Sequence, residues 1–567
     1  MKNIDVAGDF DIKSLGSLYH KDRTVFRVYA PDYQGMNLIM NGEKHQMHKK
    51  GDCFEIAFSG DLELVRYHFE SDDHVSFRDP FSYMSDEHDS YVLDQSKFIS
   101  AIYQPKKLEC DPIIYEVSVR DFSSDKSYTG RYRSKFLSFT ESGLKKDGYY
   151  SIGLDYLKEL GITHLQMMPV FDFDNDKTDY NWGYNPIAYN YVKKDYVYDQ
   201  SDPYAYVNEL RETINVLHQN DIRVTFDCVF NHVYNVKTND LGKMLKGKLY
   251  RYTKDGKLAA GTLCGSELDT ENSFVRAYIL EMIHRYFSLF DVDGIRLDLM
   301  GILDADIVNM MRNEIKEYKP DFIVYGEGWN MGDALSEDKR ASIINAGKIP
   351  EIKMFNDYFR ETMIHYVCGN DSIDDDVKHS LSSENKYLNA DQTINYVECH
   401  DDYTFYDRMI YFMNHSSIAE NQKRCMLALG LVILARGIPF IHSGEEFLRS
   451  KNGLRNTYNA PDRINKLDWN RRGEYSQFVE KTRDLIAIRK KYPDFNIEDV
   501  RVSFNSKGRC LLYQTGRMCV LFNPSSEQLN YEDGREFHVV YDEFGHCDYS
   551  ARNISVSAHC FVICQES

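Results

Sequence analysis

Short apolar runs with the character of β-strands alternate with amphipathic, helix-like stretches through the middle of this 567-residue chain. Such alternation is typical of parallel β–α units. Eight parallel strands close into a barrel, so a count of eight runs predicts an α/β fold, a (β/α)8 TIM barrel over residues 106–495. The eight runs begin at Ile113, His164, Arg223, Gly294, Phe322, Lys353, Thr393 and Ile438.

Two connections between these runs have a readable pattern. In the connection before the third run, Asp202 is expected to cap a helix and Pro203 to occupy its first position. A long segment after the third run, about residues 233–265, is rich in Lys, Gly and Asn and is expected to leave the rim of the barrel. The apolar face of the helix is predicted to consist of Val207, Leu210, Ile214 and Leu217.

The chain is too long for a single hydrophobic core, and its two ends differ in pattern from the middle. Short β-rich runs at residues 24–31, 36–40 and 53–58, separated by turn residues, predict an N-terminal β-sandwich over 1–105. Similar short runs after the last helix predict a C-terminal β-sandwich over 496–567.

The net charge of −20 argues against nucleic acid or an anionic membrane as a partner, because phosphate binding requires clustered Lys and Arg. The first residues, MKNIDVAGDFDIKS, lack the apolar region of a secretion signal, so we expect a cytoplasmic protein. The 12 cysteines form no CxxC pair, and buried, reduced thiols such as Cys228 and Cys399 are expected. We expect a monomer.

Three acidic residues stand at the carboxyl ends of three predicted strands: Asp298, Glu327 and Asp401. A barrel of this kind gathers its active site at that edge. Retaining glycoside hydrolysis needs one carboxylate to attack and one carboxylic acid to protonate, roughly 5 Å apart. Arg296 lies two residues before Asp298, on the same face of its strand, where its guanidinium can keep Asp298 ionised.

The run YNWGYNP, residues 180–186, combines two Tyr, one Trp, two Asn, a Gly and a Pro directly after the second predicted strand. Flat aromatic faces beside amide groups suit a sugar ring, which offers C–H surface for stacking and hydroxyls for hydrogen bonding. The run therefore predicts a sugar site on the rim that carries the three carboxyl groups.

This run resembles the signature of type I pullulanases, enzymes of the alpha-amylase superfamily that hydrolyse alpha-1,6 branch linkages in pullulan, amylopectin and glycogen. The stretch from Gly437 to Trp469 and the step at Asp79 to Phe81 also resemble these enzymes, whose N-terminal module is carbohydrate-binding-like. For that module a packing role and a sugar-binding role both stay open. Four further blocks resemble the conserved regions of the superfamily, in its order: residues 227–232, 293–300, 325–329 and 396–402.

The resemblance implies a role for each matching residue. Asp298 corresponds to the nucleophile, Glu327 to the general acid/base, and Asp401 to the carboxylate that positions the sugar and stabilises the transition state. It further implies that Tyr184 stacks on the sugar being cleaved. The other residues that we predict to bind or support the substrate are Tyr180, Asn181, Trp182, Asp227, His232, Arg296, Trp329 and His400.

The chain also departs from the pattern of these enzymes. Asp402 stands where relatives commonly have Asn, and residues 264–276 follow the corresponding segment only loosely, which leaves the loop contacts and the pH optimum open. Relatives often hold calcium through Asp, Asn and backbone oxygens, and Asn231 lies near such a position. We predict no required metal and no other cofactor, with calcium as the open alternative.

The leading hypothesis is a retaining hydrolase of alpha-1,6 bonds in pullulan, branched maltodextrins, or glycogen and amylopectin fragments. Its alternatives within the superfamily are an isoamylase-like debranching enzyme and an alpha-1,4-acting relative, and the run YNWGYNP favours the pullulanase. A catalytically inactive glucan-binding protein is the alternative from another class. Such a protein would be expected to lack one of the three carboxylates, and all three are present.

Overall fold

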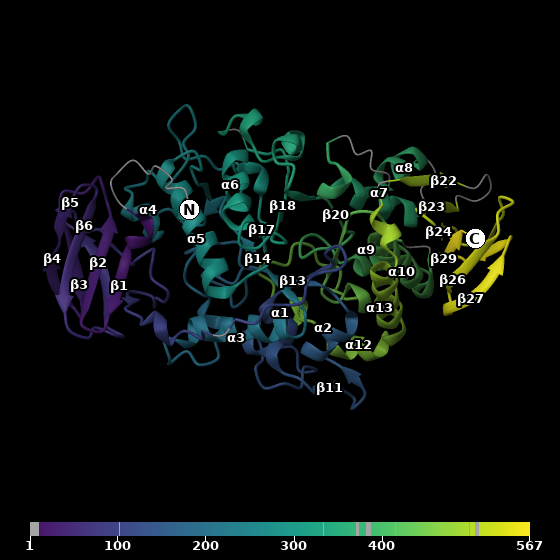
Figure 1. Ribbon diagram of the computed structural model, residues 1–567, viewed down its shortest axis with the longest axis horizontal. Coiled ribbons are helices and arrows are strands. Elements are labelled where there is room, and N and C mark those ends of the chain that lie inside the picture. The colour runs from purple at the N-terminus through teal and green to yellow at the C-terminus, as the bar shows by residue number, and fades with distance from the viewer. Residues whose placement is uncertain are drawn as a thin grey trace.

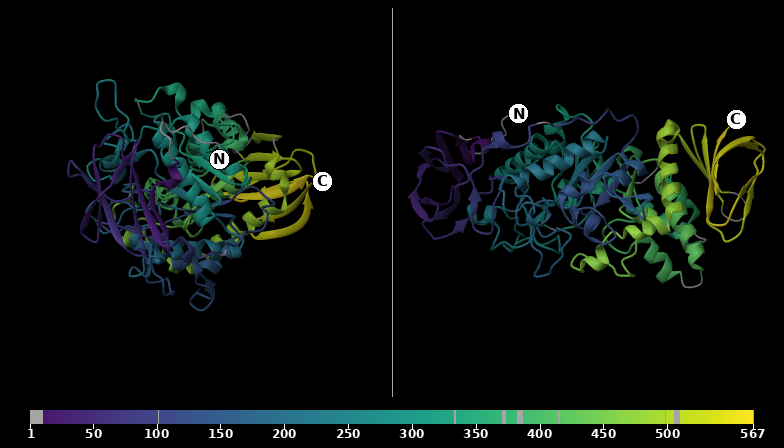
Figure 2. Two further views of the ribbon diagram at one scale, coloured as in Figure 1. Left: turned by 60° about the vertical axis from the view of Figure 1, so that its left-hand side comes forward. Right: turned by 90° about the horizontal axis from the view of Figure 1, so that it is seen from below.

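A computed structural model describes residues 11–100, 102–332, 334–369, 373–381, 387–413, 416–497, 499–504 and 510–566. The chain forms three parts along its longest axis: an N-terminal β-rich part, a central barrel surrounded by helices, and a C-terminal β-rich part (Figures 1 and 2). Residues 1–10, which form most of the N-terminal stretch used to predict a cytoplasmic location, lie outside the described residues.

The centre is a closed barrel of eight parallel strands, as the sequence predicts. Two of the strands, the first and the fifth, begin one residue later than predicted. Every residue of the first, second, third and fourth strands is buried, which explains why these strands are rich in apolar residues. The strands are β10 (Ile114–Val117), β13 (His164–Met167), β14 (Arg223–Cys228), β17 (Gly294–Leu297), β18 (Ile323–Gly326), β19 (Lys353–Phe355), β20 (Thr393–Asn395) and β21 (Ile438–His442).

Helices cover the outside of the barrel (Figure 1). The longer ones are α2 (Leu154–Leu160), α3 (Ala205–Gln219), α5 (Ser273–Phe290), α6 (Ala305–Lys316), α7 (Asp357–Val367), α8 (Asp374–Leu381), α9 (Phe405–Phe412), α10 (Ile418–Leu434) and α13 (Ser476–Lys491). Shorter ones are α1 (Val119–Ser124), α4 (Asp240–Met244), α11 (Asp462–Asn465) and α12 (Trp469–Glu474).

The start of α3 corrects one prediction. The helix begins at Ala205, so placing Pro203 at its first position was wrong by two residues. Asp202 does accept a hydrogen bond from the backbone, but from Tyr204 N at 2.9 Å, within the turn that precedes the helix. The predicted apolar face is confirmed, because Val207, Leu210, Ile214 and Leu217 are all buried.

The N-terminal part is a sandwich of two antiparallel sheets, ordered β1-β2-β6-β5 and β4-β3-β7-β8, with β9 paired to β7. The segment predicted to leave the barrel, residues 233–265, contains α4 and fastens this sandwich: Arg78 Nε donates to Asp240 Oδ2 at 2.7 Å. The strands are β1 (Gly16–His20), β2 (Arg23–Tyr29), β3 (Met36–Met40), β4 (Glu43–Gln46), β5 (His48–Lys50), β6 (Cys53–Ser59), β7 (Arg66–Ser71), β8 (Ser76–Phe77) and β9 (Ser90–Tyr91).

The C-terminal part is a six-stranded sheet, β22-β23-β24-β29-β26-β27, with the pair β25-β28 beside it. Helices α10 and α13 stand between this sheet and the barrel (Figures 1 and 2). Its strands are β22 (Val500–Phe504), β23 (Leu511–Thr515), β24 (Met518–Asn523), β25 (Leu529–Tyr531), β26 (Phe537–Asp542), β27 (Gly545–Ala551), β28 (Ile554–Val556) and β29 (Cys560–Glu566).

Two further observations bear on the sequence predictions. All 12 cysteines are free thiols; Cys228 is buried, whereas Cys399 is only partly so. Among the helices of the described ranges, none combines the length and the apolar character that crossing a membrane requires.

Candidate active site

A cavity of about 540 Å³ opens at the carboxyl ends of the barrel strands. It brings together the three predicted catalytic carboxyl groups, Asp298, Glu327 and Asp401, of which the first and the last are 103 positions apart in the sequence. Five of the predicted substrate-binding residues line the same cavity: Asn181, Trp182, Tyr184, Trp329 and His400.

Arg296, in β17, organises the floor of this cavity. Its buried guanidinium donates through Nη1 to Asp227 Oδ1 at 2.9 Å and to Asp298 Oδ1 at 3.0 Å. Nη2 donates to Glu327 Oε1. Because Arg stays charged and its fork has a fixed geometry, one cation orients three carboxyl groups from three different strand ends.

One side-chain amide and one backbone N–H donate further hydrogen bonds to Asp298 and Glu327. Asn231 Nδ2 donates to Asp298 Oδ2 at 2.8 Å, and Leu299 N donates to Glu327 Oε2 at 2.9 Å. Burial raises the pKa of Glu327 to about 8; the neighbouring charges of Asp298 and Asp401 act in the same direction, against the guanidinium of Arg296. Glu327 therefore holds a proton at neutral pH, as a general acid must.

Beside the floor, a buried acid fixes His400. The two oxygens of Glu116, in β10, lie 2.8 Å from His400 N and 2.7 Å from His400 Nδ1. Burial disfavours the charged imidazole, but the carboxylates of Glu116 and Asp401 outweigh it and raise the pKa of His400 to about 9. His400 Nε2 lies 3.6 Å from Oδ2 of Asp401, whose carboxyl group is half-exposed. The sequence analysis did not predict Glu116, although an acidic residue inside an otherwise apolar strand could have indicated it.

The aromatic run predicted to bind sugar forms one wall. The ring of Tyr184 stacks on His400 with centroids 4.8 Å apart, and its hydroxyl donates to Asp227 Oδ2 at 2.6 Å. Trp182 meets the same imidazole edge-on at 5.0 Å. Between the two aromatic residues Gly183 has a φ of 114°, a backbone conformation that favours glycine.

Lys451, in the loop after β21, contacts the residues of this wall. The sequence analysis did not predict it. Its buried ammonium donates to the carbonyl of His400 at 2.9 Å and lies 4.9 Å from the centre of the Trp182 ring. The other lining residues were not among the predicted site residues, although some lie inside the motifs: Asp176, Asn185, Tyr234, Thr262, Leu263, Cys264, Leu299, Asn456 and Tyr458.

Four predicted substrate-binding residues lie outside this cavity wall. Asp227 and Arg296 are buried in the floor, and burial raises the pKa of Asp227 to about 6. Tyr180 is buried and donates to Asp121 Oδ1 at 2.8 Å. His232 is buried with Cys264 Sγ 4.0 Å from its Nδ1. Direct contact of these four with a substrate stays a prediction.

Asp402, the departure noted in the sequence, is paired rather than isolated. Its carboxylate lies 2.9 Å from Arg408 Nη2 and 2.9 Å from Arg455 Nε. Its backbone N donates to Asn456 Oδ1 at 2.8 Å, and Asn456 N donates back to its carbonyl at 3.3 Å. Its extra charge is thus offset locally, and the loop after β20 is tied to the loop after β21.

No cluster of three or more His, Cys, Asp or Glu side chains within the described part of the chain is arranged to hold a metal ion. Asn231, near the family's calcium position, directs its amide nitrogen to Asp298. The prediction that no metal or cofactor is required stays a prediction.

Comparison with known proteins agrees with this geometry. The family model for the catalytic domain of alpha amylase matches residues 150–242 and 258–484. The chain is 33% identical over 518 residues to the pullulanase of Bacillus subtilis strain 168, covering 85% of this chain and 72% of that protein. It is 26% identical over 465 residues to pullulanase A of Streptococcus pneumoniae serotype 4, of which it spans 36%.

A solved structure is similar over the entire chain. The crystal structure of a pullulanase from Anoxybacillus sp. LM18-11, complexed with maltotetraose, superposes with a TM-score of 0.94 at 30% identity, covering 100% of this chain and 89% of that one.

The closed barrel and the carboxyl groups gathered at its rim define a class of barrel enzymes that cut glycosidic bonds. The chain belongs to the alpha-amylase family and, within it, to the pullulanases.

Proposed function

We propose that this chain hydrolyses alpha-1,6 branch bonds of alpha-glucans with retention of anomeric configuration, in pullulan, branched maltodextrins, or glycogen and amylopectin fragments. The observation that carries the proposal is the floor of the cavity, where the guanidinium of Arg296 donates hydrogen bonds to both Asp298 and the buried Glu327, whose pKa is raised to about 8. One acid and one nucleophile are what retaining hydrolysis requires.

In the first step, an oxygen of Asp298 attacks the anomeric carbon while the bond from that carbon to the leaving oxygen breaks. Glu327 gives its proton to this oxygen, so the leaving chain departs as an alcohol. A covalent glucosyl ester on Asp298 remains, and Glu327 is left as a carboxylate.

In the second step, Glu327 takes a proton from water as the water oxygen attacks the same carbon and the ester bond breaks. Two inversions restore the original configuration. Asp401, half-exposed beside a positive His400, is placed to hold the sugar hydroxyls and to stabilise the positive charge that develops on the ring. Tyr184 offers its ring face to the same sugar.

The choice of alpha-1,6 bonds rests on the rim, because the three carboxyl groups serve any alpha-glucosidic bond. The run YNWGYNP supports the assignment, and so do the pullulanases among the relatives, one of them solved with maltotetraose. An isoamylase-like or alpha-1,4-acting enzyme remains the alternative within the family. The intact, mutually bonded floor argues against an inactive glucan-binding protein.

Three further proposals accompany this function. No step of the reaction is assigned to a metal. The protein works as a monomer, with alpha-glucan as its partner and neither nucleic acid nor membrane, as its negative charge supports. It resides in the cytoplasm, a location that its 12 free cysteines support, because thiols stay reduced there.

Product analysis tests the function. Pullulan should yield maltotriose by cleavage of its alpha-1,6 bonds, whereas linear amylose should stay nearly intact. Panose or isopanose as the main product would show cleavage of alpha-1,4 bonds and would reject the pullulanase assignment, while leaving the roles of the carboxyl groups standing. Proton NMR of the first product formed should show the alpha anomer, and a beta anomer would reject the retaining mechanism.

A further inference from the structure

One residue on the wall of the active-site cavity has no structural reason to be apolar. Leu263 lines the cavity, yet its side chain is 91% exposed. Its backbone φ is 62°, in the left-handed region, where a residue with a β-carbon is strained and glycine is favoured. A leucine that packs against no core and occupies a strained position suggests a function rather than a contribution to stability.

The turn that carries Leu263 is fastened by its own hydrogen bonds, which fix the position of its backbone beside the cavity. Thr262 is buried, and its hydroxyl accepts hydrogen bonds from Cys264 N at 3.3 Å and Gly265 N at 3.1 Å while donating to Gly265 O at 2.8 Å. Leu263 N donates to Ala260 O at 3.0 Å. A preorganised turn can present a side chain to a ligand at little further entropic cost.

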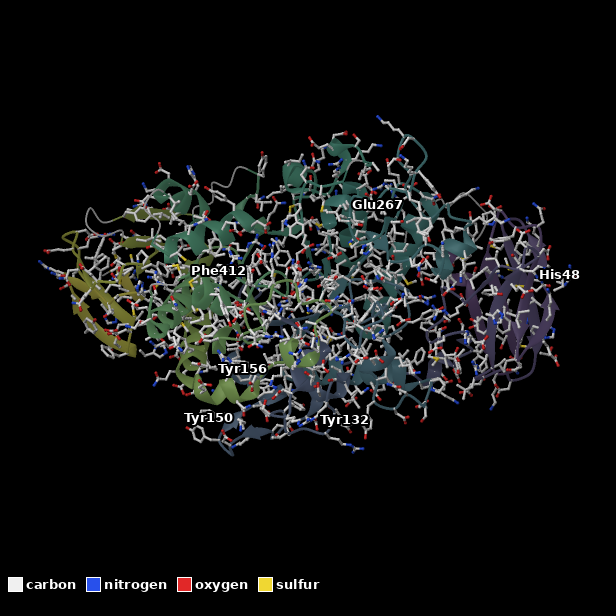
Figure 3. All side chains as sticks on the ribbon, turned by 180° about the vertical axis from the view of Figure 1, so that it is seen from behind. His48, Tyr132, Tyr150, Tyr156, Glu267 and Phe412 are labelled. Atoms are coloured by element: carbon white, nitrogen blue, oxygen red, sulfur yellow. The ribbon has the colours of Figure 1, made fainter. Side chains whose placement is uncertain are left out.

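The turn lies on the side of the cavity that carries Glu327. It packs against the loop that follows Glu327, so closely that a β-carbon added at Gly261 would lie 2.6 Å from Gly332 Cα. Gly261 N also donates to Glu267 Oε1 at 2.9 Å. Glu267 belongs to β16 (Ser266–Glu267), which lies apart from the N-terminal sandwich that carries His48 (Figure 3). Because the general acid protonates the leaving oxygen, walls that adjoin its loop border the leaving sugar.

We propose that Leu263 is a specificity-determining residue that contacts the apolar C–H face of the first sugar on the leaving chain. This inference rests on the proposed function and adds the glucan on the far side of the cleaved bond. Leucine suits that task because it offers apolar surface without competing for the hydroxyls of the sugar.

The test compares two substrates that share the glycosyl part and differ in the leaving group. Pullulan loses a glucan chain, whereas alpha-maltotriosyl fluoride loses a fluoride ion and has no leaving sugar. Leu263→Gly, which removes the side chain and suits the backbone, should lower kcat/KM on pullulan by about fivefold to tenfold and leave the value on the fluoride unchanged. Leu263→Asn, which tolerates the left-handed region, should behave like Leu263→Gly, and Leu263→Met should stay close to wild type.

The chain offers a matched control. Leu64, in the N-terminal sandwich, has a φ of 64° and an exposed side chain, so Leu64→Gly relieves the same backbone strain away from the cavity. Leu64→Gly should leave kcat/KM unchanged on both substrates. An equal loss of kcat/KM in Leu263→Gly on both substrates, or no loss on pullulan, would overturn the proposal. Wild-type enzyme that releases no maltotriose from pullulan would instead contradict the proposed function, so the two failures are distinguishable.

Discussion

The floor and the rim of the cavity are built differently. The floor residues Arg296, Asp298 and Glu327 stand at the ends of parallel strands, and both carboxyl groups accept hydrogen bonds from Arg296. The rim consists of loops, and several of its turning points have positive φ, among them Leu263 at 62° and Asp402 at 64°. A strand end fixes a side chain through the barrel, whereas a loop fixes it only through its own hydrogen bonds and neighbours.

This difference separates two tasks. The floor supplies chemistry that serves any alpha-glucosidic bond, and the rim selects which bond reaches it. Changes in the floor should therefore reduce turnover strongly on every substrate. Changes in the rim should be smaller and should depend on the substrate.

The largest effect is expected in the floor. Asp298→Asn removes the nucleophile and Glu327→Gln removes the proton donor, so each should lower turnover by at least ~10³-fold, about 4 kcal/mol of barrier, on pullulan and on short branched maltodextrins alike. Circular dichroism and thermal unfolding should confirm that both variants fold. A folded variant that kept more than a tenth of wild-type turnover would remove that residue from its role. Azide should restore activity to a small Asp298 variant and give a glucosyl azide of inverted configuration.

The pH dependence offers a second test of the floor. Glu327 must be protonated to act as an acid, and its pKa is raised to about 8, so wild-type kcat/KM should fall as the pH rises through that value. The negative charge of Asp401 contributes to this raised pKa. Asp401→Asn should lower turnover by about 10²-fold, and its residual activity should fall at a lower pH than that of wild type. If the alkaline fall in activity occurred at the same pH in Asp401→Asn as in wild type, Asp401 would not contribute to the pKa of Glu327.

How far the sequence predicts the molecule follows the same division. The starts of the barrel strands were predicted within one residue because buried parallel strands are rich in apolar residues. Asp298 and Glu327 follow those strands directly and Asp401 lies in the loop after β20, so their convergence at one edge of the barrel could also be predicted. The start of α3 could not, since the turn at Asp202 delays the helix by hydrogen bonds that propensity does not encode.

The rest of the site depends on contacts between loops distant in sequence. The ring of His232, whose contact with substrate stays a prediction, lies against Cys264 and Gly265, 32 and 33 positions further along the chain. Lys451 reaches His400 from the loop after the eighth strand. Local sequence patterns carry no information about such contacts, because the conformation of each loop depends on neighbours that are distant in the sequence.

Tyr184 stands where the floor meets the rim and should show an intermediate effect. Tyr184→Ala removes the ring that stacks on His400 and should lower turnover by about 10²-fold. Tyr184→Phe keeps the ring but deprives Asp227 of a donor at 2.6 Å, so a loss of about threefold to tenfold is expected. Equal losses would assign the function to the hydroxyl. Thermal midpoints measured alongside would identify a merely structural effect, in which stability and activity fall together.

The smallest effect is expected at Asp402, on the rim. Asp402→Asn keeps the size of the side chain and its tolerance of a positive φ, but it removes the charge paired with Arg408 and Arg455. Partly exposed ion pairs contribute up to about 1 kcal/mol each, so stability should fall slightly and turnover by less than about threefold. Because the two guanidinium groups already offset this charge, the alkaline limb set by Glu327 should not move. A shift of that limb would show that the rim reaches the floor electrostatically, and the separation between the two regions would fail at this residue.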